Sequence, residues 1–178
     1  QLAAAGCKVI IDDITFINAP MLKDGIVAKT INSLKAQGVF HVTSAGNFAN
    51  KSYEKNFNPV DATSIGFPGK MAHNFGSNNS SPDFFQKVWL KPGDHLFVFQ
   101  WADLIFSNDD LAGTQFDVDV FICPGDKTDG TNLIAFNRDN RLGDPIEFIP
   151  IKIPGNGPCD TAAKAYNILI VNNTPGGN

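Results

Sequence analysis

The sequence has few positive charges and no cluster of them. Its 14 Lys and Arg residues are spread along 178 positions, and 18 Asp and Glu residues give a formal net charge of −4. Proteins that bind nucleic acid or anionic membranes through charge carry basic patches. We therefore expect neither nucleic acid nor an anionic lipid surface to be the main partner.

Long apolar runs are absent as well. No stretch approaches the ~20 apolar residues with which a helix crosses a bilayer, and no signal peptide is visible. The chain starts without Met, and residues 1–7 lead directly into an apolar strand. We therefore expect a piece of a longer polypeptide without a membrane span, so the missing signal peptide says nothing about the compartment.

Cysteine is scarce, with Cys7, Cys123 and Cys159 as its only occurrences. Their spacing matches no metal-binding motif. Cys123 and Cys159 both fall in the second half of the chain, where a disulfide between them is one interpretation. The other is that all three are ordinary small apolar residues.

Tyrosine and tryptophan are rare, with two of each beside 15 Phe. Phe has no polar handle, so most of these rings are expected to fill cores. Hydrophobic residues make up 43% of the chain and charged residues 18%, which is typical of a globular protein. The 16 Gly and 11 Pro residues predict many turns.

The first fifty residues follow the pattern of a strand, a helix and a second strand. Residues 8–14 form an apolar, β-branched run, which is typical of a parallel strand covered on both faces. An apolar stripe, with Asn18 and Pro20 before it and Gly38 after it, predicts a helix over residues 21–37. Residues 39–43 form the second strand, so the pattern indicates a right-handed βαβ unit.

Two acids, Asp12 and Asp13, interrupt the end of the first strand. Sheets of α/β proteins place their sites at the carboxyl ends of the strands, which is where these acids fall. The alternative is that both simply face water.

From about residue 70 the pattern changes to short segments in which apolar and polar residues alternate. Strands are predicted over residues 84–90, 95–101, 115–122, 133–136, 146–153 and 165–171, while residues 50–69 show no period and are interpreted as a connection. Six strands without a convincing helix are typical of an antiparallel sandwich or jelly roll. The predicted fold class is an α/β fragment over residues 1–69, followed by an all-β sandwich or jelly-roll domain over residues 70–178.

Asn47 is the sharpest candidate for chemistry. It comes after the second strand and after the small residues Ser44, Ala45 and Gly46, which let a substrate approach. Acyl transfer builds up an oxyanion, and a preorganised amide donor stabilises it. The alternative is an ordinary Gly-Asn pair in a loop after a strand.

The order and spacing of these elements resemble the oxyanion-hole segment of the subtilisin-like serine proteases. In that family a strand, a helix that begins near a Pro and a second strand lead into Ala-Ala-Gly-Asn or Ser-Ala-Gly-Asn. Residues 44–47 here read Ser-Ala-Gly-Asn, and the likeness covers residues 1–50. By this resemblance Asn47 is the oxyanion donor of a peptide-bond hydrolase.

The resemblance also implies a substrate-binding strand. Asp13, Ile14 and Thr15 would line the primary specificity pocket and pair with the substrate backbone. Commoner members of the family have small residues such as Ser-Leu-Gly at the end of this strand, whereas here it reads Asp12-Asp13-Ile14. The substrate preference therefore does not carry over, and the chain looks like a divergent bacterial branch.

The same resemblance implies machinery that the chain lacks. The family's catalytic Asp and His motifs would precede Gln1, and its Gly-Thr-Ser-Met-Ala nucleophile motif is not in the sequence. We interpret the β region as an insertion before a nucleophile that lies beyond Asn178. The chain would then be an inactive fragment of a secreted endopeptidase that acts on polypeptides, located outside the cell, on its surface or in the periplasm.

The three histidines do not rebuild a catalytic triad. His41 falls in a strand, His73 in a loop and His95 at the start of a strand. Structural or solvent-facing roles are expected for each of them.

A group of carboxylates in the β region is a second candidate site. Asp103, Asp109, Asp110, Asp117 and Asp119 lie near one another in the sequence. Alternation along a strand puts Asp117 and Asp119 on one face, about 7 Å apart. One interpretation is a set of oxygen ligands for Ca²⁺, although no calcium-loop motif matches. The default interpretation is a solvated strand face, with no metal and no other cofactor.

A binding module is the competing function. On this hypothesis the β region recognises carbohydrate, peptide or its own protease domain, with Phe97, Phe99 or Trp101 as contacts, or the parent is a degenerate pseudoprotease. The alternative for these three rings is core packing.

Overall fold

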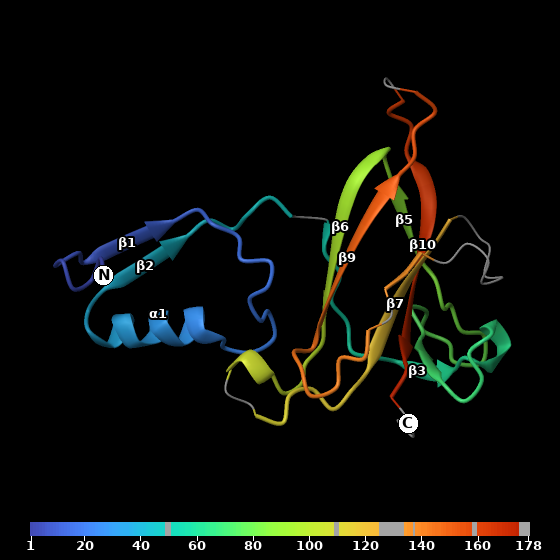
Figure 1. The fold of residues 1–178 in the computed structure, drawn as a ribbon, viewed down its shortest axis with the longest axis horizontal. Coiled ribbons are helices and arrows are strands. Elements are labelled where there is room, and N and C mark those ends of the chain that lie inside the picture. Colours follow the sequence, from blue (N-terminus) through green and yellow to red (C-terminus); the bar gives the residue numbers. More distant parts are fainter. Residues whose placement is uncertain (49–50, 109–110, 125–133, 137, 158–159, 175–178) are drawn as a thin grey trace. The chain divides into compact units, whose positions relative to one another are not determined.

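The computed structural model describes the whole chain apart from residues 49–50, 109–110, 125–133, 137, 158–159 and 175–178. It is built mostly of β-strands arranged in several sheets (Figure 1), and the described residues form one α-helix. The chain divides into two compact units, Gln1–Lys55 and Asn56–Asn178. The prediction of a β-rich second half is confirmed.

The first unit contains two strands and the helix. Strand β1 (Val9–Asp12) is followed by α1 (Ile26–Ala36) and β2 (Phe40–Thr43). The two strands pair in parallel, with Val9 opposite Phe40 and Asp12 opposite Thr43. Their carboxyl ends therefore lie side by side.

The helix begins later than the sequence predicts. It was expected from residue 21, but its N-cap is Gly25, whose backbone is extended. The Pro20 ring packs against this glycine, since a Cβ built there would lie 2.8 Å from Pro20 Cδ. The helix begins at Ile26, directly after this contact. At the other end Gly38, with φ +77°, follows the helix as predicted.

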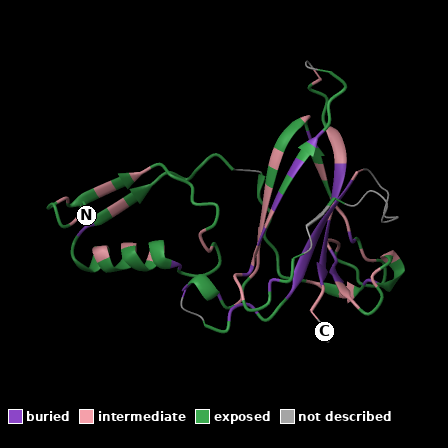
Figure 2. Ribbon diagram, viewed as in Figure 1, coloured by how far each residue is buried: buried purple, intermediate pink, exposed green. Residues whose placement is uncertain are grey.

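One face of the β1–β2 pair is open. Val9, Ile11, Phe40 and Val42 are 56%, 74%, 72% and 52% exposed, because residues that alternate along a strand point to opposite faces. Figure 2 shows exposed and partly buried residues alternating along β1 and along the first three residues of β2. The expectation of a strand covered on both faces is therefore not met in the first unit as described.

The second unit is organised by antiparallel pairing. Its strands are β3 (Pro59–Asp61), β4 (Met71–His73), β5 (Gln86–Leu90), β6 (Gly93–Gln100), β7 (Val118–Pro124), β8 (Ile134–Phe136), β9 (Ile146–Ile153) and β10 (Lys164–Asn172). One sheet has the order β3-β4-β10-β7-β8, with β5 also paired to β10, and β6 pairs with β9 in a second sheet.

The larger core lies between these two sheets. From β9 it receives Ile149, Ile151 and Ile153, each no more than 6% exposed, and from β7 it receives Val120 and Ile122. Alternation along β9 buries every second residue from position 147 to position 153. This is the pattern from which the sequence predicted the strand, and its predicted limits match those observed.

A smaller core covers the opposite face of the larger sheet. Here Ala62 and Ala72 are fully buried beside Leu169, and the Phe67 ring lies 5.1 Å from the Phe121 ring, centroid to centroid. Residues 50–69 were predicted to be a connection only, but they contain β3 and a 3-10 helix that help to build this core. Strands of three residues are too short for alternation to be recognised.

No helix in the described parts of the chain is long and apolar enough to span a membrane.

We expect a fragment that starts at residue 56 to be more stable than one that starts at residue 70. The shorter fragment lacks β3 and Ala62 and uncovers Phe121, and the loss of several buried apolar groups costs about 3 kcal/mol or more. Both tryptophans, Trp89 and Trp101, lie in this unit, so their fluorescence during thermal unfolding measures the difference. Equal midpoints would show that residues 56–69 are dispensable for this unit.

Candidate functional site

Polar side chains gather at the carboxyl end of the β1–β2 pair. The Nε2 atom of His41 lies 2.6 Å from Oδ2 of Asp12. The Thr43 hydroxyl donates a 2.7 Å hydrogen bond to Oδ1 of the same carboxylate, and the backbone amide of Ile14 donates to it at 3.4 Å. Asp12 thus joins its own strand to β2 through two side chains.

These contacts change the acidity of Asp12. Its pKa is lowered, mainly by the hydrogen bond from Thr43, with smaller contributions from the Ile14 amide and from His41, while desolvation acts in the opposite direction. A lowered carboxylate pKa stabilises the folded unit at pH values above the ordinary pKa of Asp, and this contribution is lost as the pH falls through the lowered pKa.

Beside this cluster lies an open hollow of about 310 Å³ between α1 and the strands. Its polar lining consists of Asp12, Thr30 and His41. The remaining lining is apolar and consists of Ile10, Ile14, Phe16, Ile26, Val27, Ile31 and Leu34. The side chains of His41 and Asp12 are 13% and 25% exposed, so the pair sits at the margin of this hollow, within reach of solvent.

The residues predicted from the resemblance lie just beyond the two strand ends. Asn47 is exposed, and Asp13, Ile14 and Thr15 are exposed on the segment after β1. The Thr15 hydroxyl oxygen lies 3.9 Å from the position that a Cβ on Gly46 would occupy. The structure therefore brings the predicted substrate strand next to the predicted oxyanion loop.

Sequence reasoning considered His41 and Asp12 separately and missed their contact. The strands were predicted to be parallel, but their register was not, and it is the register that places Ile10 opposite His41 and Asp12 opposite Thr43. In parallel strands with that register, residues 10, 12, 41 and 43 share one face. The signal in the sequence was an acid, Asp12, and a histidine, His41, on two adjacent strands, at positions that this register places on the same face.

The other two histidines have structural contacts. His73 was predicted in a loop but ends β4, is 2% exposed, and accepts a 3.0 Å hydrogen bond at Nδ1 from the Asn58 amide. His95 lies in β6, with Nε2 2.8 Å from the carbonyl oxygen of Lys91. Neither contact involves a hydroxyl nucleophile, in agreement with the structural roles predicted.

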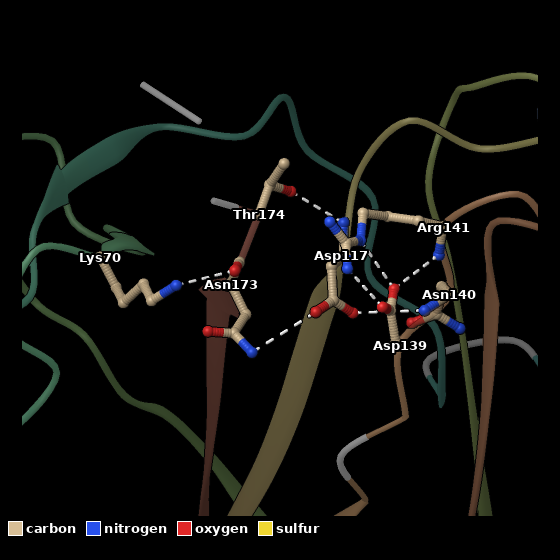
Figure 3. A network of polar contacts seen from close by, with 7 residues as sticks. All are labelled: Lys70, Asp117, Asp139, Asn140, Arg141, Asn173 and Thr174. Atoms are coloured by element: carbon tan, nitrogen blue, oxygen red, sulfur yellow. Dashed lines mark hydrogen bonds and ion pairs between the residues drawn. The ribbon is translucent and has the colours of Figure 1, made fainter. Parts of the chain in front are cut away.

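Asp117 and Asp119 are buried, so the prediction of a solvated strand face is wrong for these two carboxylates. Asp117 is 5% exposed and Asp119 2% exposed. Asn140 donates its backbone amide to Asp117 Oδ1 at 3.3 Å, and the Asn173 side chain donates to Oδ2 at 3.4 Å. Figure 3 shows the chain segments around residues 139–141 and 173–174 converging on Asp117. These segments cover the strand face that carries Asp117, which alternation in the sequence had predicted to face water.

Asp103 accepts hydrogen bonds from residues 114 and 115. The Thr114 hydroxyl and the Gln115 amide donate to its Oδ2 at 2.5 and 2.8 Å. Asp109 and Asp110 lie outside the described residues. Among the residues that are described, no three acidic, His or Cys side chains come together as a metal-binding group.

Asp119 and Glu147 are buried acids of the second unit whose pKa values are both raised. Burial raises the pKa of Asp119 to about 7, with further increases from the nearby Asp117, Glu147 and Asp139, against a decrease from Lys70. The pKa of Glu147 is also raised by burial. Nearby Asp139 differs, because hydrogen bonds from Arg141 lower its pKa to about 2.

Cys123 is a free, buried thiol whose pKa burial raises to about 11. Cys159, its predicted partner, lies outside the described residues. Phe97, Phe99 and Trp101 all pack against the larger core, with the Phe99 and Trp101 ring centroids 5.7 Å apart. This packing favours the core role for these rings over the role of ligand contacts.

Comparisons of the chain with models of protein families, with curated proteins and with solved structures give no match.

We expect Thr43→Val to raise the pKa of Asp12 toward its ordinary value, because the variant removes the hydrogen bond with the largest effect. Carboxyl chemical shifts followed by NMR across an acid titration measure this pKa. Thr63→Val, which changes an exposed threonine of the second unit, serves as the control and should leave it unchanged. An unaltered Asp12 pKa in Thr43→Val would contradict the role given to Thr43.

Proposed function

We propose that this chain is part of a subtilisin-like serine endopeptidase. In this proposal the first unit is a βαβ fragment of the parallel catalytic sheet, and the second is an inserted β-sandwich of jelly-roll type. The polypeptide substrate lies along Asp13, Ile14 and Thr15, and Asn47 donates a hydrogen bond to the oxyanion. The nucleophile, general base and orienting acid come from outside this chain, so the chain alone does not hydrolyse peptides.

The observation that carries the proposal is the shared edge of two strand ends. Parallel pairing of β1 and β2 puts the segment after β1 beside Ser-Ala-Gly-Asn, with Thr15 close to Gly46. An extended substrate at the first segment would place a scissile carbonyl near the second. Both Asn47 and the predicted substrate strand are exposed, as the approach of a polypeptide requires.

The chemistry assigned to Asn47 is electrostatic. Attack on a peptide carbonyl places negative charge on its oxygen, and an amide N–H held in position stabilises that charge without reorganisation. The preceding small residues leave room for the substrate backbone. The bonds of Asp12 to His41 and Thr43 hold the ends of both strands together, which limits movement of the loop that carries Asn47.

A binding module remains the second candidate, and a different aromatic residue favours it. Trp89 on β5 is 68% exposed, and exposed Trp is enriched among the residues that dominate binding energy at interfaces. On this hypothesis Trp89, rather than Phe97, Phe99 or Trp101, contacts the ligand.

In a polypeptide that joins this chain to the catalytic Asp, His and Ser, we expect Asn47→Ala to lower kcat by about 10²–10³-fold. This is the range known for removal of an oxyanion donor from a subtilisin. KM should change little, because the bond forms in the transition state. Steady-state hydrolysis of a peptide substrate measures both constants.

Asn18→Ala is the matched control, because it removes the amide of another exposed asparagine in a loop of the same unit. It should leave kcat unchanged. An Asn47→Ala enzyme with wild-type kcat would contradict the oxyanion role, and with it the main support for the proposed function.

A further inference from the structure

Glu147 lies in the row of side chains that builds the larger core. Along β9, residues 147, 149, 151 and 153 are all buried, and the other three are isoleucines of that core. Glu147 is 0% exposed. A carboxylate therefore occupies a position that alternation assigns to an apolar side chain.

The oxygen atoms of Glu147 have no hydrogen-bond partner. Both Oε1 and Oε2 are buried and unpaired, as are Oδ1 of Asp119 and Oδ1 of Asn140. The Asn140 side chain lowers the pKa of Glu147, but by less than burial raises it, and its amide nitrogen donates to the Ile146 carbonyl at 3.2 Å. Four buried side-chain acceptor atoms of this unit thus lack donors.

The nearby cations are bound to groups other than Glu147 and Asp119. Lys70 Nζ donates to the Asn173 carbonyl at 2.8 Å, as Figure 3 shows, and Arg138 donates to the Ile146 carbonyl at 3.2 Å. Arg141 binds Asp139 at 2.5 Å. Besides Glu147, the charged groups that act on Asp119 are Asp117, Asp139 and Lys70. Those that act on Glu147 are Asp117 and Arg138.

An ionised carboxylate without a partner is costly in a core. Desolvation of a charge costs several kcal/mol, and a buried group of this kind is normally neutralised. A protonated carboxyl avoids this desolvation cost. Its O–H can also donate a hydrogen bond to an acceptor such as the Asn140 amide oxygen. The local shortage of donors and the excess of negative charge are thereby relieved together.

We propose that Glu147 and Asp119 hold protons in the folded chain, and that these protons make the stability of the second unit depend on pH. The unit is most stable in acid and loses stability as the pH rises and the two carboxyls ionise. This device is independent of the proposed proteolytic function.

The sign follows from linkage. A carboxyl with a raised pKa binds its proton more tightly in the folded than in the unfolded chain, so its contribution is complete below the unfolded pKa and is lost as the pH rises through the folded value. For Asp119 this interval runs from 3.8 to about 7. The lowered pKa of Asp139, about 2, acts below this interval.

A bound divalent cation is the competing explanation for the same oxygens. Two carboxylates and an amide oxygen are suitable ligand types for Ca²⁺. Within the described residues, however, no three acidic, His or Cys side chains form a metal-binding group. The geometry therefore favours protonation over Ca²⁺ binding as the explanation for these oxygens, and the experiment below distinguishes the two.

The test is thermal unfolding of the full chain, followed by Trp fluorescence in the presence of a chelator between about pH 5 and about pH 8. The midpoint of the wild-type chain should fall by about 10 °C across this range. Glu147→Gln and Asp119→Asn replace each protonated carboxyl by a neutral side chain of the same shape. Each should flatten the dependence and raise the midpoint near pH 8 above that of the wild type.

Asp94→Asn is the matched control, because Asp94 is an exposed acid on β6 of the same unit, and it should keep the wild-type dependence. An infrared band of a protonated carboxylic acid near neutral pH, lost in Glu147→Gln or Asp119→Asn, supports the proposal independently of stability. It remains usable if one of the two variants does not fold.

Two results would overturn the proposal. One is a wild-type midpoint that stays constant or rises toward pH 8, together with absence of the infrared band. The other is a rise of the wild-type midpoint on addition of millimolar Ca²⁺ that both variants lose, because the carboxylates would then be ionised cation ligands.

Discussion

Backbone amides and carbonyls removed from water must all find partners, and this requirement organises both units of the chain. In the second unit it is met around β10 (Lys164–Asn172), which pairs with β7 over residues 166–172 on one side. On the other side it pairs with β5 over residues 164–168 and with β4 over residues 171–172. Because successive side chains of a strand point to opposite faces, β10 contributes to both cores. Ile170 enters the larger core, and Leu169 enters the smaller one. The two cores thus share one strand, and a disturbance of its pairing reaches both.

The first unit meets the same requirement with a single parallel ladder. Pairing of β1 with β2 leaves the outer edge of each strand and the face with Phe40 and Ile11 uncovered. Parallel sheets are normally covered on both faces, so this unit relies more than usual on side-chain bonds across the ladder. The bonds of Asp12 to His41 and Thr43 are of that kind. They also fix where the two following loops begin, which links the local electrostatics to the position of Asn47.

The parts of the fold that the sequence predicts are those governed by local alternation or by a terminator. Strand β9 is one example, since isoleucines at positions 149, 151 and 153 define its buried face and its end. The start of α1 was predicted at residue 21, but the observed N-cap is Gly25, against which Pro20 packs. The short strands β3 and β4 depend on pairing that no window of three residues reveals. For the candidate site, the closeness of Thr15 and Gly46 follows from parallel order alone. The contact of His41 with Asp12 requires the register as well, and the burial of Asp117 requires knowledge of which distant segments cover it.

Glu147 differs from these cases, because alternation does predict its burial. The segment Ile-Glu-Phe-Ile-Pro-Ile-Lys-Ile puts the glutamate in phase with three core isoleucines, while its other charged residue, Lys152, falls in the exposed phase. An apolar side chain of similar volume at position 147 would remove the desolvation cost and leave the core packing intact. The carboxyl therefore weakens the folded unit whenever it is ionised and costs little when it is neutral. A core position of this kind makes stability conditional on proton concentration, and alternation within one strand is enough to identify it.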